Sequence, residues 1–247
     1  MMLSRLVLPE VLDDLPEDDP RAMQSRRDLR RVHLVMGTRS ILLQALQDMP
    51  ALRRTGAPLR ILELGAGDGS LMLSVARALG PAWAPVHLTL LDAQSLVTRG
   101  TIASYAELGW TAVTSVLDVF EWADDPTGAD RRGKRYVPWD LIVANLFLHH
   151  FEGAQLVGLL RTIADRSDRF LACEPRRAWL PLVGSHLIGA LGTNAVTRED
   201  AVLSVHAGFR GGELTALWPG LGDTWEVQEY SAGLFSHCFR AEPILED

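Results

Sequence analysis

The sequence predicts an α/β fold in which a doubly wound, mostly parallel sheet of seven strands carries helices on both faces. Three observations support this prediction. Short apolar runs alternate with helical patterns between residues 59 and 173. A glycine-rich turn follows the first apolar run, and acidic residues follow the next two. Such alternation is typical of parallel strands joined by helices that cover both faces of the sheet.

Residues 1–50 are predicted to form an arm followed by lid helices. The first 20 residues are acidic and contain three prolines, which favours an extended segment. Between residues 23 and 47 apolar residues recur at helical spacing, with a break near Gly37. This pattern indicates one or two amphipathic helices. A linker at residues 50–58 leads into the main domain, which is predicted at residues 51–247.

The main domain begins with strands and helices in alternation. Strands are predicted at residues 59–64, 86–91, 111–116, 141–144 and 168–173. Helices are predicted at residues 70–79, 96–108 and 153–164, and a charged loop at residues 124–135. Residues 175–222 interrupt the alternation and are predicted to form a helical insert. Strands at residues 225–230 and 234–240, joined by Ser231, Ala232 and Gly233, complete the sheet as an antiparallel hairpin.

The composition indicates a soluble chain that does not bind nucleic acid. The 247 residues are 47% hydrophobic, which allows a large core. The net charge of −7 disfavours phosphate contacts. No signal segment is present, and no apolar run approaches the roughly 18 residues that span a membrane. Cys173 and Cys238 lie in apolar runs without a CxxC partner, so we expect buried thiols in a cytoplasmic protein.

Acidic residues end the first three predicted strands. Glu63 precedes glycines 65, 67 and 69, and Asp92 and Asp118 follow the next two strands. Ligands of open α/β sheets bind outside these carboxyl ends. A carboxylate after the second strand can accept the hydroxyls of a ribose, and one after the third can accept an adenine amino group. Because a helix N-terminus favours an anionic group, the pattern predicts an adenosine ligand with an anionic end.

Two classes of cofactor fit an adenosine site. A dinucleotide fingerprint G-x-G-x-x-G would place its third glycine where this chain has Ser70. A carboxylate at Glu63 would repel a pyrophosphate but attract the ammonium group of S-adenosylmethionine (SAM). The residues therefore favour SAM, with a nicotinamide-dependent oxidoreductase as the alternative enzyme class.

The motifs Glu63–Gly69, Leu91–Asp92, Leu117–Phe120 and Asp140–Phe151 resemble those of class I SAM-dependent methyltransferases, which have a Rossmann-like fold. The resemblance covers residues 55–175 and the terminal hairpin. It implies that Glu63 and the glycine turn meet the methionine portion, that Asp92 takes the ribose, and that Asn145 offers its carbonyl to the amino group. The cofactor residues that it implies are Glu63, Gly65, Ala66, Gly67, Asp92, Ala93, Asp118, Val119 and Asn145.

The sequence points to a small organic acceptor. The Asn/Asp-Pro-Pro-aromatic motif of amine methylases and the Pro-Cys motif of cytosine C5 methylases are both absent after the fourth strand. Residues 193–209 resemble bacterial methyltransferases of natural-product pathways. We therefore expect O-methylation of a phenol or polyketide-like compound. Carbon or nitrogen methylation and a non-catalytic binding protein stay open as alternatives, and the oligomeric state is left undefined.

Histidines after the fourth strand are candidate bases. His149 and His150 could take a phenol or hydroxyl proton, since imidazole titrates near neutrality. His33, Glu174 and Arg176 are candidates for acceptor binding. Both imidazoles and Glu174 could also hold a metal ion. No third ligand stands at diagnostic spacing, so the sequence predicts no metal.

Overall fold

The computed structural model describes residues 3–49, 57–80, 83, 85–125, 138–222 and 224–244. These residues form a seven-stranded sheet in the order β3-β2-β1-β4-β5-β7-β6. Its strands are β1 (Leu59–Leu64), β2 (Val86–Asp92), β3 (Trp110–Val116), β4 (Leu141–Asn145), β5 (Phe170–Pro175), β6 (Trp225–Ala232) and β7 (Ser236–Pro243). The first five are parallel, whereas β7 runs antiparallel between β5 and β6. The predicted fold class is confirmed.

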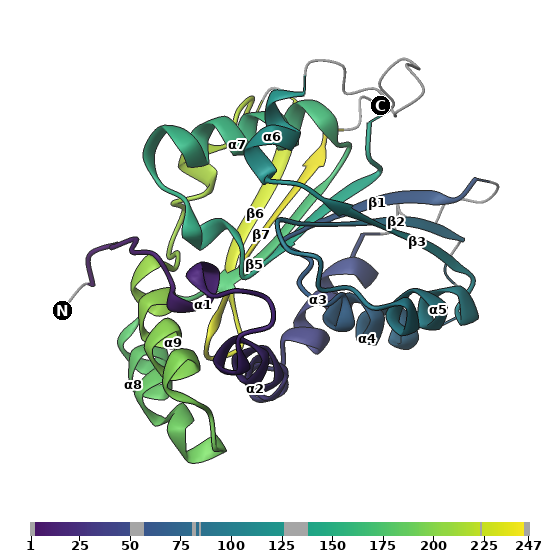
Figure 1. The fold of residues 1–247 in the computed structure, drawn as a ribbon. Coiled ribbons are helices and arrows are strands. Elements are labelled where there is room, and N and C mark those ends of the chain that lie inside the picture. Colours follow the sequence, from purple (N-terminus) through teal and green to yellow (C-terminus); the bar gives the residue numbers. More distant parts are fainter. Residues whose placement is uncertain are drawn as a thin grey trace.

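Helices pack on both faces of the sheet (Figure 1). One face carries α3 (Thr38–Gln47), α4 (Ser70–Leu79) and α5 (Arg99–Glu107), and the other carries α6 (Val119–Asp124) and α7 (Gly153–Arg166). Each face of the sheet has its own hydrophobic core, the first under α3, α4 and α5 and the second under α6 and α7. Successive side chains of a strand point alternately into these two cores. Along β1, Ile61 packs into the first core, and Leu62 and Leu64 pack into the second. Burial of both faces explains why the central strands β1, β4 and β5 read as nearly continuous apolar runs.

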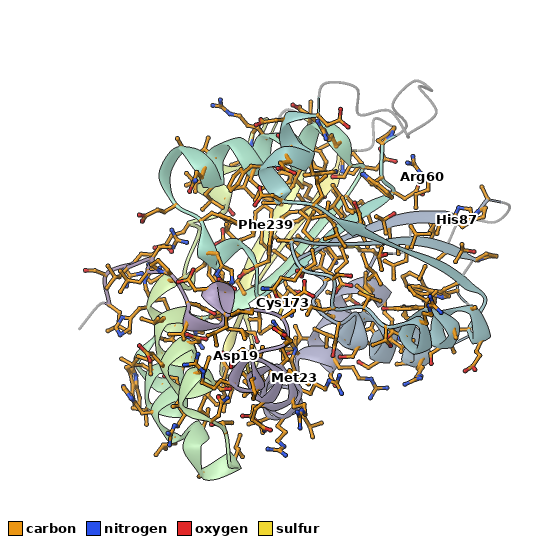
Figure 2. All side chains as sticks on the ribbon, in the orientation of Figure 1. Asp19, Met23, Arg60, His87, Cys173 and Phe239 are labelled. Atoms are coloured by element: carbon orange, nitrogen blue, oxygen red, sulfur yellow. The ribbon has the colours of Figure 1, made fainter. Side chains whose placement is uncertain are left out.

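Four helices gather at one end of the sheet (Figure 1). They are α1 (Val11–Asp14), α2 (Pro20–Met36), α8 (Trp179–Leu187) with its 3-10 extension η3 (Ile188–Leu191), and α9 (Ala195–Ala207). In Figure 2, Arg60 and His87 at the starts of β1 and β2 lie far from Asp19 and Met23 of the α2 region. These helices, called the lid helices below, therefore lie over the carboxyl ends of the strands.

The predicted break in the N-terminal helical segment is confirmed at Gly37. Asp19 caps the start of α2 by accepting a hydrogen bond from the Arg21 N–H, and Gly37 ends the helix with φ of 69°. That left-handed conformation costs glycine little, so α3 can begin directly after it.

Several element boundaries differ from the predictions, and β5 starts and ends two residues later than predicted. Helix α5 starts at Arg99 because Thr98 caps it, accepting from the Thr101 N–H at 3.1 Å. The hairpin ladder continues to the Ala232–Ser236 pair, so its turn begins at Gly233 rather than at residue 231. Helices α1 and α6 and the 3-10 turn η2 (Leu148–His150) were not predicted, whereas the 3-10 turn η4 (Thr215–Leu217) lies within a predicted helical turn at residues 213–218.

Some of the predicted segments fall on residues that the structure does not describe. Most of the predicted linker at 50–58, the boundary between residues 50 and 51, and most of the loop at 124–135 lie outside the described residues. Cys173 and Cys238 face each other across β5 and β7 as buried free thiols. Within the described ranges, no helix has the length and apolar character needed to cross a bilayer.

Candidate functional site

The glycine turn after β1 has a backbone that requires glycine. Gly65, Gly67 and Gly69 have φ values of 67°, 56° and 71°. A Cβ on Gly65 would lie 2.4 Å from the ring of Phe147, so this ring packs directly against the turn. The Ala66 N–H donates to the carbonyl of Leu91 at 3.0 Å, which joins the turn to the end of β2. The turn is thus fixed by backbone conformation, by packing and by the sheet.

Asp92 holds the same turn from the end of β2. Its carboxylate accepts hydrogen bonds from the Gly67 N–H at 2.8 Å and from the Gln94 N–H at 2.9 Å. Burial raises the pKa of Asp92 above its usual value. Ala93, the next residue, is exposed. The structure thus brings together the predicted ribose ligand and the glycine turn.

Two buried polar oxygens at the strand ends have no hydrogen-bond partner among the described residues. They are Oε2 of Glu63 and Oδ1 of Asn145. The register of β1 and β4, with Leu64 opposite Ala144, places both residues at neighbouring strand ends. Burial, with the charges of Asp92 and Asp68, raises the pKa of Glu63 to about 8. Because buried acceptors are normally satisfied, this pair is suited to a cationic donor such as an ammonium group.

The predicted adenine residues lie at the end of β3. The Leu117 N–H donates to the carbonyl of Asp92 at 3.0 Å, which places this segment beside the ribose candidate. Asp118 is exposed and caps α6 by accepting from the Phe120 N–H at 2.7 Å. Val119 is buried in the core on the α7 side of the sheet. Asp118 therefore has a structural role in addition to any contact with a ligand.

A cavity of about 270 Å³ lies between the lid helices and the strand ends. Its wall is mainly apolar and includes side chains of α2, α8 and α9, together with Leu146 and Pro175 from the ends of β4 and β5. The polar lining residues are Glu10, Ser25, Ser185, Thr197, Asp200 and Ser204. No arginine, lysine or histidine lines the cavity within the part of the chain that the structure describes. We call it the lid cavity.

Leu146 lies on the wall of the lid cavity, directly after Asn145. It has φ of 49°, the one positive value for a residue other than glycine in the described ranges. Left-handed backbone costs a branched side chain energy and often marks functional sites. Leu146 therefore lies between the predicted cofactor residue Asn145 and the lid cavity, and its backbone is strained.

His149 is held between two carboxylates. Its Nδ1 lies 2.8 Å from Oε2 of Glu174, and its Nε2 lies 3.3 Å from Oε1 of Glu10. Glu174 is fully buried and accepts from three consecutive backbone N–H groups at residues 147–149. Hydrogen bonds to both carboxylates outweigh the effect of burial and raise the pKa of His149 to about 9. Glu10 also accepts a hydrogen bond from Ser204 and lines the lid cavity.

His150 stacks beside His149 with ring centroids 4.2 Å apart. Its Nδ1 lies 3.2 Å from Oδ2 of Asp13 in α1. Glu10, His149 and His150 each offer one ligand atom, and these atoms lie within 4.8 Å of one another. These three residues, called the histidine cluster below, have the chemistry to hold a metal ion.

The three candidates for acceptor binding do not line the lid cavity. Glu174 is instead turned toward η2 and His149, because its oxygens accept the N–H groups there. His33 of α2 is half-buried near Asp68, and desolvation of its ring lowers its pKa to about 4. The backbone N–H of Arg176 donates to the carbonyl of Phe235, and its guanidinium has no hydrogen-bond or ion-pair partner among the described residues. The neighbouring Arg177 is the buried arginine, bound to the carbonyls of Leu3 and Gly208 and to Glu213.

Sequence reasoning missed the residues that the lid contributes. Glu10 reaches His149 across 139 positions, and Asp200 accepts from the Val11 and Leu12 N–H groups across 189 and 188 positions. Contacts between residues this far apart in the sequence leave no local sequence pattern from which they could be predicted. Arg30 of α2 also pairs with Asp68 in the glycine turn, with its Nε 3.1 Å from Oδ2. The one signal in the sequence for this contact was the cluster of arginines at residues 26–31, which could pair with an acidic residue such as Asp68.

Comparisons with known proteins identify the fold. No family model and no curated protein matches the sequence. The plantazolicin methyltransferase BpumL, solved in complex with SAH, matches with a TM-score of 0.63 and 13% identity, and the match covers 91% of each chain. The magnesium protoporphyrin IX methyltransferase ChlM from Synechocystis PCC 6803, solved with bound SAM, matches with a TM-score of 0.50 and 11% identity over 94% of this chain and 87% of its own.

A third match is the CurJ carbon methyltransferase, with a TM-score of 0.50 and 15% identity over 82% of this chain and 53% of that one. Identities this low carry information about architecture and not about substrate. The chain therefore has the Rossmann-like fold of class I SAM-dependent methyltransferases.

Proposed function

We propose that this protein is a SAM-dependent methyltransferase that acts on a small, largely apolar acceptor. The observation that carries the proposal is the pair of unpartnered buried oxygens, Glu63 Oε2 and Asn145 Oδ1, beside a glycine turn at the sheet's carboxyl edge. The ammonium group of an adenosine cofactor such as SAM would supply hydrogen-bond donors to these two oxygens. A pyrophosphate has only acceptor oxygens and would leave both of them unpaired. That two proteins of this fold were solved with SAM or SAH supports the same assignment.

The proposed cofactor contacts follow the strand ends. SAM supplies an electrophilic methyl group on a sulfonium. Glu63, once ionised, holds the ammonium group, and Gly65, Ala66 and Gly67 allow close approach of the backbone. Asp92 keeps lone pairs for the ribose hydroxyls while it binds two backbone N–H groups. Ala93, Asp118, Val119 and Asn145 complete the set, with Asp118 facing the adenine amino group as its β3 position suggests.

The lid cavity is the proposed acceptor site. It meets the cofactor candidates at Leu146, next to Asn145, and is covered by α2, α8 and α9. An apolar wall binds an aromatic or polyketide-like molecule and excludes water, which helps to align acceptor and methyl group. We propose O-methylation of a phenol or a polyketide-like hydroxyl as the reaction. The protein's contribution is alignment and desolvation more than chemistry of its own.

The histidines take a modified role in this proposal. Both ring nitrogens of His149 face carboxylates, and neither histidine lines the lid cavity. Glu10 does line it, and His149 and Ser204 fix its position. We therefore propose that His149 and His150 act on the acceptor through Glu10, as positioning residues rather than as direct bases.

Nitrogen methylation is the second candidate reaction. The cavity wall contains two carboxylates, Glu10 and Asp200, and none of its described lining residues is basic. Such a wall favours an acceptor with an amino group over an anionic one. Acceptors that share a ring system but carry a hydroxyl or an amine at one position would separate the two reactions.

Thermal-shift titration with SAM, SAH and NAD tests the cofactor assignment. Ligands that bind the folded state raise the unfolding midpoint, so SAM and SAH should raise it and NAD should not. Glu63→Gln is the matched control, because it keeps the side-chain shape and removes the charge. A shift with NAD and none with SAM would contradict the proposal.

Methyl transfer from labelled SAM to the paired hydroxyl and amine acceptors then identifies the reaction, and no transfer to any of them would indicate a binding protein.

A further inference from the structure

We propose that Glu10, His149 and His150 bind a divalent transition-metal ion of the zinc type at the polar edge of the lid cavity. One ligand atom from each residue lies within 4.8 Å of the others. Two imidazoles and a carboxylate are a common ligand set for zinc, and three protein ligands leave a coordination position open. The sequence predicted no metal because no third ligand stood at diagnostic spacing from the two histidines. Glu10 supplies it from a distant part of the chain.

The surroundings of His149 are those of a metal ligand. Nδ1 lies 2.8 Å from Glu174, which leaves Nε2 as the atom directed at Glu10. Metal-binding histidines usually donate their second N–H to a carboxylate, which fixes the tautomer and the ring plane. Glu174 is itself immobilised by the N–H groups of residues 147–149 and is fully buried. An ion pair between His149 and Glu10 would not require such a rigid support behind the ring.

The second histidine is positioned in a similar way. The His150 ring lies 4.2 Å from that of His149 between centroids, tilted by 34°. Asp13 Oδ2 lies 3.2 Å from His150 Nδ1. Asp13 can therefore orient this ring as Glu174 orients the other, or add a further oxygen ligand. Two of the three acidic partners of the histidines, Glu10 and Asp13, come from the N-terminal segment, so a metal ion would join this segment to η2.

The place of the site suggests what the ion would bind. Glu10 belongs to the histidine cluster and to the wall of the lid cavity. An ion held there would offer its open position to an oxygen donor such as a hydroxyl or phenol oxygen. Coordination to a divalent cation lowers the pKa of such a group. The inference concerns metal binding and stands whether or not the chain transfers methyl groups.

Metal titration of the full chain tests the proposal. The purified protein is treated with a chelator, dialysed, and titrated with ZnCl₂ by calorimetry and with CoCl₂ by visible absorption. We expect one ion per chain and a cobalt spectrum typical of a low-coordinate site with nitrogen ligands. Glu10→Gln and His149→Ala should each weaken binding at least about tenfold. His87→Ala, at the start of β2 and far from the cluster, is the matched control and should bind as the parent does.

A further variant separates a metal site from an ion pair. Glu174→Gln keeps the size of the side chain but weakens the orientation of His149, and changes of this type reduce metal affinity about 10- to 100-fold. Affinity should fall in this variant even when its circular dichroism and unfolding midpoint match those of the parent. Absence of stoichiometric binding by the parent, or binding that Glu10→Gln leaves unchanged, would overturn the proposal. Calorimetric titration with SAM in the same samples reports on the proposed function separately.

Discussion

At the scale of single residues, Glu63 shows the cost of preparing a site before its ligand arrives. Glu63 is 3% exposed, and because burial raises its pKa to about 8 its carboxyl group holds a proton at neutral pH. An unfolded chain would ionise it near pH 4.5. The folded state therefore loses stability as the pH rises from about 4.5 to about 8, by up to about 3 kcal/mol at pH 7. A cationic ligand would remove this penalty.

Glu63→Gln should stabilise the ligand-free protein and weaken its binding of SAM. The amide carries no charge to desolvate, so the unfolding midpoint of the ligand-free protein should rise by a few degrees at pH 8. Affinity for SAM should fall about 10- to 100-fold, because a hydrogen bond to a charged group contributes about 1.5–3 kcal/mol. Differential scanning calorimetry and isothermal titration measure the two effects. A variant that binds SAM as tightly as the parent would exclude the ammonium contact.

The same carboxyl group predicts a pH dependence of cofactor binding. Below its pKa of about 8 the group must release a proton before it can pair with an ammonium. Affinity for SAM should therefore rise up to about tenfold per pH unit between pH 6 and 8 and then level off. Titrations in two buffers of different ionisation enthalpy should show proton release at pH 7. In Glu63→Gln both the slope and the proton release should disappear.

Residue-scale prediction from sequence succeeded where the signal was local. The glycine turn and the acids that end β1 and β2 were read from residues within a few positions of each other, and the structure brings them together at the strand ends. Glu10 and Asp200 could not be found in this way, because each acts on a partner more than a hundred positions away. Glu174 was grouped with both histidines from the sequence, but its hydrogen bonds to the backbone N–H groups of η2 depend on the fold and could not be read from it.

At the scale of elements, α2 is the part of the lid that contacts the proposed cofactor loops. Arg30 pairs with Asp68 in the glycine turn, and Arg26 Nη2 donates to Gln94 Oε1 at 2.8 Å after β2. Both contacts come from one face of the helix, one turn apart. Helix α2 thus bridges the two loops between which the cofactor would lie, and its contacts must open for exchange.

Arg30→Ala should shorten the residence time of SAM. The Arg30 side chain is 62% exposed, so its ion pair contributes at most about 1 kcal/mol. The dissociation rate should rise about twofold to fivefold with little change in the unfolding midpoint. Stopped-flow displacement by SAH measures the rate. Arg27→Ala is the control, since Arg27 donates to Met23 of its own helix. Equal rates in both variants would show that the α2 contact does not limit release.

At the scale of the whole molecule, residues 3–14 run along the lid as a strap. Arg5 donates to the carbonyls of Ala207 and Phe151, and Arg177 donates to that of Leu3. Asp200 of α9 accepts from the Val11 and Leu12 N–H groups at 2.8 and 3.0 Å and so caps α1. The sequence predicted an extended arm. Its attachment to α9 and η2 depends on tertiary contacts that composition does not encode.

Asp200→Ala should release the strap. Two backbone N–H groups would lose their acceptor, which costs about 1–3 kcal/mol. Hydrogen exchange in residues 3–14 should accelerate, while β1 and β4 keep their protection. Glu199→Ala, at an exposed position of the same helix, is the control and should leave the exchange unchanged. Unaltered exchange in Asp200→Ala would show that the arginine contacts alone retain the strap.

The place of β7 within the sheet affects how the protein can be made. This strand lies between β5 and β6, although it is the last of the seven to leave the ribosome. Until β7 emerges, β5 is paired only with β4, and β6 has no strand to pair with. Co-translational folding can therefore close the parallel half early, but completion of the sheet waits for β7. A premature stop in the hairpin should yield an aggregation-prone product rather than a shortened working protein.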